Sequence, residues 1–227
     1  MTAAQRAGRI IGVVIIVQMV GGFLVNFVLE APLFGVPGFL VNGAPHAAQV
    51  ALAALSGLFT EGLWLVTAAT VFAFFWQRSQ GLAVGFIALA AVLLAAAVFE
   101  SAGVMSMLSA SQAYAKADEA GRGQFELMRI VVASARNWAH FIARILDGVT
   151  LFVFYVGMYR YALIPRLLAG LGLIAAPLMI SGLLMPFFGH EVIFPLLAPL
   201  GLSELMLAVW LAVKGLRDEQ GLKEPTA

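Results

Sequence analysis

Five ionisable side chains recur at helical spacing within one apolar stretch of the sequence, residues 126–161. At 100° per residue they fall within an arc of about 80° on one helix face. They are Arg129, Arg136, His140, Arg144 and Asp147. An ionisable group at membrane depth costs about 2.5–3.5 kcal/mol on insertion scales, so such groups face the bundle interior and pair. The pattern predicts a polar face that meets charged partners on neighbouring helices.

Isolated carboxylates in other apolar stretches are the expected partners of this face. A rise of about 1.5 Å per residue places all of them in the outer half of a membrane. These acids are Glu61, Glu100 and Glu204. Together with Asp147 they oppose only two arginines, at 136 and 144. The excess of carboxylates predicts that at least one of them is protonated, hydrated or neutralised by a cation.

A binding site for a small ligand, a proton or a cation is the function that this group of residues favours. The predicted site comprises Glu61, Glu100, Arg136, His140, Arg144, Asp147 and Glu204. Two alternatives stay open. The charge network is only a scaffold in a structural or accessory subunit, or it serves an intramembrane metal-dependent enzyme through His140 and Asp147. The enzyme is the least favoured of the three. No nucleotide-binding loop or nucleophile elbow is present, so nucleotide chemistry is not indicated.

Metal and cofactor chemistry have little support in the sequence. The three histidines, His46, His140 and His190, come from separate segments and form no His-x-x-x-His or His-Glu-x-x-His motif. The chain has no cysteine, which excludes disulfides, thiolate metal sites and cysteine nucleophiles. We therefore predict no bound metal and no cofactor, and we assign no catalytic residue. The net charge of +1 argues against nucleic acid as a partner, whereas an oligomer is compatible with the sequence.

The elements that carry these residues are predicted to be transmembrane helices. The chain has 227 residues and is 62% hydrophobic and 11% charged, whereas soluble domains carry about 25% charged residues. Six apolar stretches reach the roughly 20 residues that a spanning helix needs, and strand alternation is absent. We expect an all-α bundle of six transmembrane helices in one domain, 1–227, with the lipid bilayer as its surroundings. The helices are expected at about 9–30, 49–77, 81–108, 126–161, 167–188 and 194–216.

Basic residues between the predicted helices set the expected orientation. Only Lys116 and Arg122 lie on one side. The other side carries Arg6, Arg9, Arg78, Arg160, Arg166, Lys214, Arg217 and Lys223. The positive-inside rule then places both termini in the cytoplasm.

Three segments are predicted to lie outside the spanning helices. Residues 31–47 form an apolar outer loop, broken by prolines, which lies on the membrane surface or re-enters it. Residues 109–124 form a polar outer loop with a short solvated helix, and residues 217–227 form a cytoplasmic tail.

Two motifs in the second half resemble a bacterial membrane family known as domain of unknown function 4386. In "MYRYALIPRLLAGLGLIAAPL" (158–178), an arginine precedes Leu-Pro-Arg at the start of a Gly- and Leu-rich helix; the matching residues are Arg160, Pro165 and Arg166. The second motif, "LSELMLAVWLAVKGL" (202–216), matches at Glu204, Trp210, Lys214 and Gly215, while Ser203 replaces a glycine. The resemblance implies a small multi-pass protein of the bacterial inner membrane. It implies no activity and supplies no site residue.

Overall fold

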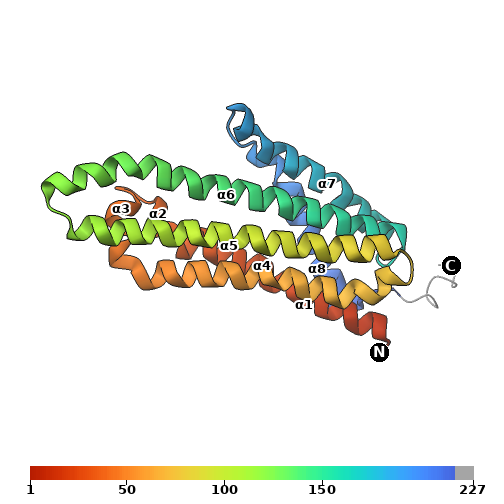
Figure 1. Cartoon of the computed structure of the whole chain (residues 1–227). Coiled ribbons are helices and arrows are strands. Elements are labelled where there is room, and N and C mark those ends of the chain that lie inside the picture. The colour runs from red at the N-terminus through yellow and green to blue at the C-terminus, as the bar shows by residue number, and fades with distance from the viewer. Residues whose placement is uncertain (218–227) are drawn as a thin grey trace. The chain divides into compact units, whose positions relative to one another are not determined.

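The computed structural model describes residues 1–217, and this part of the chain is helical without a strand (Figure 1). Six continuous helical stretches are long and apolar enough to cross a membrane, which confirms the predicted all-α class. The long helices are α1 (Ala3–Leu24, continued by the π-helical η1, Val25–Leu29), α4 (Ala47–Trp76), α5 (Gln80–Lys116), α6 (Glu119–Arg160), α7 (Arg166–Leu184, continued by η3, Met185–Phe188) and α8 (Ala198–Lys214, preceded by η4, Phe194–Leu196). The predicted tail at 217–227 lies outside the described residues, apart from Arg217.

Contacts between residues divide the chain into two compact units, which we describe separately. Unit 1 comprises Met1–Val17, Leu63–Leu93 and Arg144–Ala227, and unit 2 comprises Gln18–Gly62 and Leu94–Ala143. Helices α4, α5 and α6 therefore contribute residues to both units. The single-domain organisation stays a prediction.

An aromatic core holds unit 1 together. The indole of Trp64 packs edge-on against Phe86, with ring centroids 6.2 Å apart, and Phe86 stacks on Phe154 at 5.5 Å. Phe75 completes the group, and Gly157 leaves room for its ring, since a Cβ there would lie 2.4 Å from it. Rings in these offset and edge-on arrangements contribute about 0.5–1.5 kcal/mol per pair beyond the area they bury.

Glycines allow α1 and α8 of unit 1 to touch backbone to backbone. A Cβ at Gly8 would lie 2.1 Å from the backbone nitrogen of Leu216, and one at Gly12 would lie 2.4 Å from that of Ala212. The amide of Leu216 also donates to the carbonyl of Ala4 at 3.3 Å. The two ends of the described chain are therefore packed against each other.

The segment Gln18–Gly62 of unit 2 includes three short helices within residues 31–46, which we call the cap. It consists of α2 (Ala31–Phe34), α3 (Phe39–Asn42) and the short 3-10 helix η2 (Ala44–His46), and α2 and α3 lie beside the end of α5 and the start of α6 (Figure 1). Leu33, Phe39 and Leu40 are buried in an apolar cluster with residues of α4 and α5. The predicted outer loop is thus packed on the core of unit 2.

A buried serine fastens the cap to α5. The hydroxyl of Ser111 donates to the carbonyl of Leu40 at 2.8 Å and accepts from the amide of Ala44 at 2.7 Å. Gly43 makes this approach possible, because a Cβ there would lie 2.9 Å from Ser111. These two hydrogen bonds satisfy cap backbone groups that an apolar segment cannot satisfy by itself.

The predicted polar loop at 109–124 is wrong in its extent. Helix α5 continues to Lys116 and α6 begins at Glu119, which leaves two residues between them. The good helix formers before Lys116 continue the helix, and the side chain of Asp118 accepts the amide of Gly121 at 2.8 Å, as an N-terminal cap does. These local effects outweigh the helix-breaking tendency of Gly121.

Candidate functional site

A buried arginine is the centre of the charged cluster in unit 2. Arg136 of α6 is 5% exposed, and its Nη2 donates to Oε2 of Glu30, which is 3% exposed at the end of η1. The same nitrogen lies 3.4 Å from Oε1 of Glu100 on α5. Three helical segments therefore bring one cation and two carboxylates together, and removing one member of such a pair typically costs about 3–5 kcal/mol.

A histidine one turn further along α6 contacts the same cluster. Nδ1 of His140 lies 2.7 Å from Oε1 of Glu100, so this carboxylate is shared between His140 and Arg136. When Glu100 is ionised it only accepts hydrogen bonds, so Nδ1 of His140 is then the donor in this contact. His140 is 24% exposed, more than the other three ionisable members.

The cap covers this cluster with an aromatic ring. The guanidinium carbon of Arg136 lies 4.8 Å from the ring centroid of Phe34. On another side Gly103 admits the arginine, since a Cβ there would lie 3.0 Å from the Cβ of Arg136. We call Glu30, Phe34, Glu100, Arg136 and His140 the Arg136 site. The buried Nε of Arg136 has no hydrogen-bond partner among the described residues, so the site has an unused donor.

A second polar group lies in unit 1. Nη1 of Arg144 is 3.8 Å from Oδ2 of Asp147, one turn away on α6. Nε1 of the buried Trp64 donates to Oδ1 of Asp147 at 3.0 Å. The indole thus holds the aspartate while its ring packs in the aromatic core. The resulting position of Asp147 is fixed by a neutral donor as well as by the arginine.

The structure distributes the seven predicted site residues over the two units. It brings Glu100, Arg136 and His140 together in unit 2 and Arg144 and Asp147 together in unit 1. Glu61 is half-buried on α4 in unit 2, and Glu204 is half-buried on α8 in unit 1.

One arginine of the predicted polar face is not part of either group. Arg129 is exposed and pairs with Glu126, at 3.4 Å and within one turn of α6. An exposed pair of this kind contributes at most about 1 kcal/mol. At Arg136 and His140 the predicted face does meet a carboxylate of a neighbouring helix, Glu100 on α5.

Glu30 is the site residue that sequence reasoning missed. It ends the first apolar run, directly before the proline-rich segment. That position is a usable signal, but it also suits a residue that simply ends a helix. Its carboxylate contacts Arg136 where the chain leaves η1 and enters the cap.

Within residues 1–217, no group of three or more His, Cys, Asp or Glu side chains has an arrangement that suits a metal ion. His46 is exposed, and its Nδ1 lies 2.8 Å from the carbonyl of Asn42. His190 is exposed after η3. The histidines of the cap and of the η3 end are therefore surface residues.

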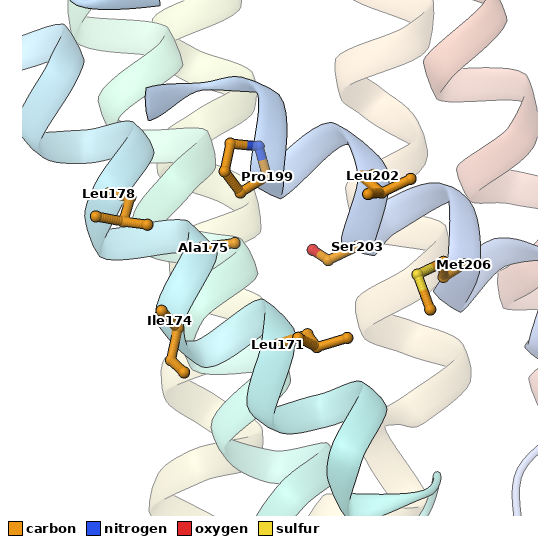
Figure 2. Close-up of a pocket in the computed structure, with 8 residues that line it drawn as sticks. All are labelled: Leu171, Ile174, Ala175, Leu178, Pro199, Leu202, Ser203 and Met206. Carbon is orange, nitrogen blue, oxygen red and sulfur yellow. The ribbon is translucent and has the colours of Figure 1, made fainter. Parts of the chain in front are cut away.

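An apolar groove opens between α7 and α8 of unit 1 (Figure 2), with a volume of about 170 Å³. It is lined by Leu171, Ile174, Ala175, Leu178, Pro199, Leu202, Ser203 and Met206. Its one hydroxyl, on Ser203, bonds to the hydroxyl of Tyr155 at 3.3 Å and donates to the carbonyl of Leu200 at 2.9 Å. No ionisable group lines the groove, so its chemistry differs from that of the Arg136 site.

The six membrane-spanning candidates among the described helices place the chain among multi-pass membrane proteins. It belongs to the family described as "Domain of unknown function (DUF4386)", whose model matches residues 10–215. No curated protein and no solved structure matches the chain.

Proposed function

We propose that the protein is a binding or transport protein that takes up a proton at the Arg136 site. The observation that supports this is the 2.7 Å contact between His140 and Glu100, in a cluster whose other ion pair is almost fully buried. Imidazole is the side chain that ordinarily changes charge between pH 5 and 8. The side chain of His140 is 24% exposed, whereas those of Arg136 and Glu30 are almost fully buried.

The shared carboxylate links proton uptake to the cap. When His140 becomes positively charged, Glu100 is attracted more strongly to the imidazolium and less exclusively to Arg136. The guanidinium is then free to strengthen its bond to Glu30, the residue that directly precedes the cap. A change of charge at His140 therefore alters the position of the Arg136 guanidinium, and with it the contact between Arg136 and the ring of Phe34.

We also propose that the Arg136 site is near the outer boundary of a bacterial inner membrane, with both termini in the cytoplasm. On α6, 20 residues separate His140 from Arg160 (160 minus 140), which is about 30 Å of helix and equals the usual hydrocarbon thickness. The count of basic residues supports this orientation. Reporter fusions after residues 117 and 190 should report the outside and one after residue 217 the inside; the reverse pattern would refute the orientation.

Charge displacement after a pH jump tests the proposed proton site. Proteoliposomes on a solid-supported membrane are switched from about pH 8 to about pH 5, the range in which imidazole titrates. Proton binding gives a transient current, and transport gives a sustained one. We expect the wild-type signal to be lost in His140→Gln and kept in His46→Gln, which removes an exposed histidine of the cap. A full signal in His140→Gln, or a wild-type signal no larger than that of empty liposomes, would refute the proposal.

A scaffold is the second candidate, and one observation favours it. The Arg136–Glu30 pair is almost fully buried beneath Phe34 and against Gly103, as a pair that only fixes helix register would be. A scaffold predicts loss of folding on removal of Arg136 but no displaced charge in the wild type. The pH jump therefore separates the two candidates.

A further inference from the structure

Seven basic residues gather at one end of unit 1, and the Arg136 site does not use them. The ends of α1 and α8, the α4–α5 turn and the α6–α7 turn all lie at this end (Figure 1). The basic residues are Arg6, Arg9, Arg78, Arg160, Arg166, Lys214 and Arg217, and we call this set the basic end.

Backbone contacts hold these cations close together. The amide of Arg217 donates to the carbonyl of Leu163 at 2.8 Å, which ties the end of α8 to the turn between Arg160 and Arg166. The guanidinium of Arg9 donates to the carbonyl of Val213 at 3.2 Å, beside Lys214. The close glycine contacts of α1 with α8 also hold the start of α1 against the end of α8. The fold therefore imposes the clustering of like charges.

The α4–α5 turn joins the group through an aromatic contact. The guanidinium carbon of Arg78 lies 5.8 Å from the ring centroid of Tyr161, in the α6–α7 turn. The other six cations are exposed. None of the ion pairs found within residues 1–217 includes any of these six.

The nearest acids along the described helices are distant. Glu204 precedes Lys214 by ten residues on α8, and Asp147 precedes Arg160 by 13 on α6. These separations correspond to about 15 Å and about 20 Å of helix. Like charges held close together repel one another, and anions from the surroundings relieve that repulsion.

We propose that the basic end is a binding surface for the headgroups of anionic phospholipids, and that Arg160, Arg166 and Arg217 form its centre. The surface lies where candidate spans end, which is the level of the headgroups. Trp76 and Tyr159, 41% and 44% exposed, stand at the same helix ends, as interfacial aromatic residues do. Guanidinium groups bind phosphate oxygens in a bidentate geometry. Arg160 and Arg166 also belong to the motif that relates the chain to its family.

Native mass spectrometry of the whole protein with two lipids of identical acyl chains tests this surface. We expect phosphatidylglycerol to be retained more tightly than phosphatidylcholine by the wild type. A cation near an anionic surface strengthens binding about fivefold, so the triple variant Arg160→Gln/Arg166→Gln/Arg217→Gln should bind phosphatidylglycerol roughly a hundredfold more weakly. The matched control is Lys116→Gln/Arg122→Gln/Arg129→Gln, which removes three exposed cations of unit 2 and should change retention little.

A salt series on the wild type keeps the test decisive if the triple variant does not fold. Raising the salt from about 0.05 M to about 0.5 M shortens the screening length, so retention of phosphatidylglycerol should fall towards that of phosphatidylcholine. Equal retention of the two lipids, retention that salt does not change, or equal losses in the two triple variants would each overturn the proposal.

Discussion

In unit 2 the guanidinium of Arg136 is buried between two carboxylates beneath the ring of Phe34, whereas in unit 1 most arginines stand exposed at the rim of an aromatic core. The same side chain thus has two environments in one chain. In unit 1 the interior is filled mainly by rings such as Phe75, Phe86 and Phe154, and the Arg144–Asp147 pair is less buried than Arg136 and Glu30. In unit 2 part of the interior is occupied by charged side chains, those of Arg136 and Glu30.

This difference bears on how each unit is stabilised and on where we look for function. Aromatic packing stabilises a helix bundle without any desolvation of charge. A buried ion pair is a weak source of stability, because the desolvation of its members offsets much of their attraction. Ionisable groups kept at membrane depth are therefore candidates for function. In our proposals, unit 2 therefore carries the proton site and unit 1 carries the surface that anchors helix ends.

The largest expected effect is that of removing the buried cation of unit 2. Arg136→Met leaves the carboxylate of Glu30 without this guanidinium and should lower the free energy of unfolding by about 3–5 kcal/mol. Thermal unfolding in detergent measures the change. Arg129→Met is the control, since that arginine is exposed and paired only with Glu126, and it should cost less than about 1 kcal/mol. Similar losses in both variants would contradict the buried pair.

A glycine of unit 1 should show the second effect. In Gly12→Ala the new Cβ would lie 2.4 Å from a backbone nitrogen of α8, so α1 and α8 must separate, at a cost of about 1–3 kcal/mol. Gly85→Ala on α5 is the matched control, because nothing lies within 4 Å of its Cβ. That change should leave stability equal or raise it by up to about 1 kcal/mol, through helix propensity. The comparison fails if the two alanines destabilise equally in the same unfolding assay.

The smallest effect concerns the ring that covers the Arg136 site. Phe34→Leu keeps an apolar side chain in the cap but removes the attraction between ring and guanidinium, a loss of about 1 kcal/mol. Phe27→Leu, at a ring that is 70% exposed in the same unit, should change the unfolding temperature less. Equal shifts would show that Phe34 acts only as apolar surface.

The helices were predictable from the sequence because lipid allows few alternatives. Twenty apolar residues, a basic flank and the absence of strand alternation are enough to define a spanning helix. What the sequence did not predict concerns residues beyond the apolar runs. Around Asp118, local capping extended two helices through a polar stretch, and in the cap the burial of Leu33 and Phe39 depends on partners distant in the sequence.

The site was predictable in part, for a similar reason. Helical spacing placed Arg136 and His140 on one face, and depth placed Glu100 near them. Glu30 was missed because its contact depends on how the chain leaves the first helix, which periodicity does not encode. The bond between Trp64 and Asp147 was missed because an indole in an apolar run suits packing as well as hydrogen bonding.

Nitrogen NMR of histidine-labelled protein tests the central claim, that His140 is a proton site. The chain has three histidines, so the ¹⁵N spectrum has three imidazoles, which His46→Gln and His190→Gln assign. We predict that the His140 signals change from the neutral to the protonated form between about pH 8 and pH 5, the range in which imidazole ordinarily changes charge. A His140 ring that stays in one protonation state across this range would contradict the account.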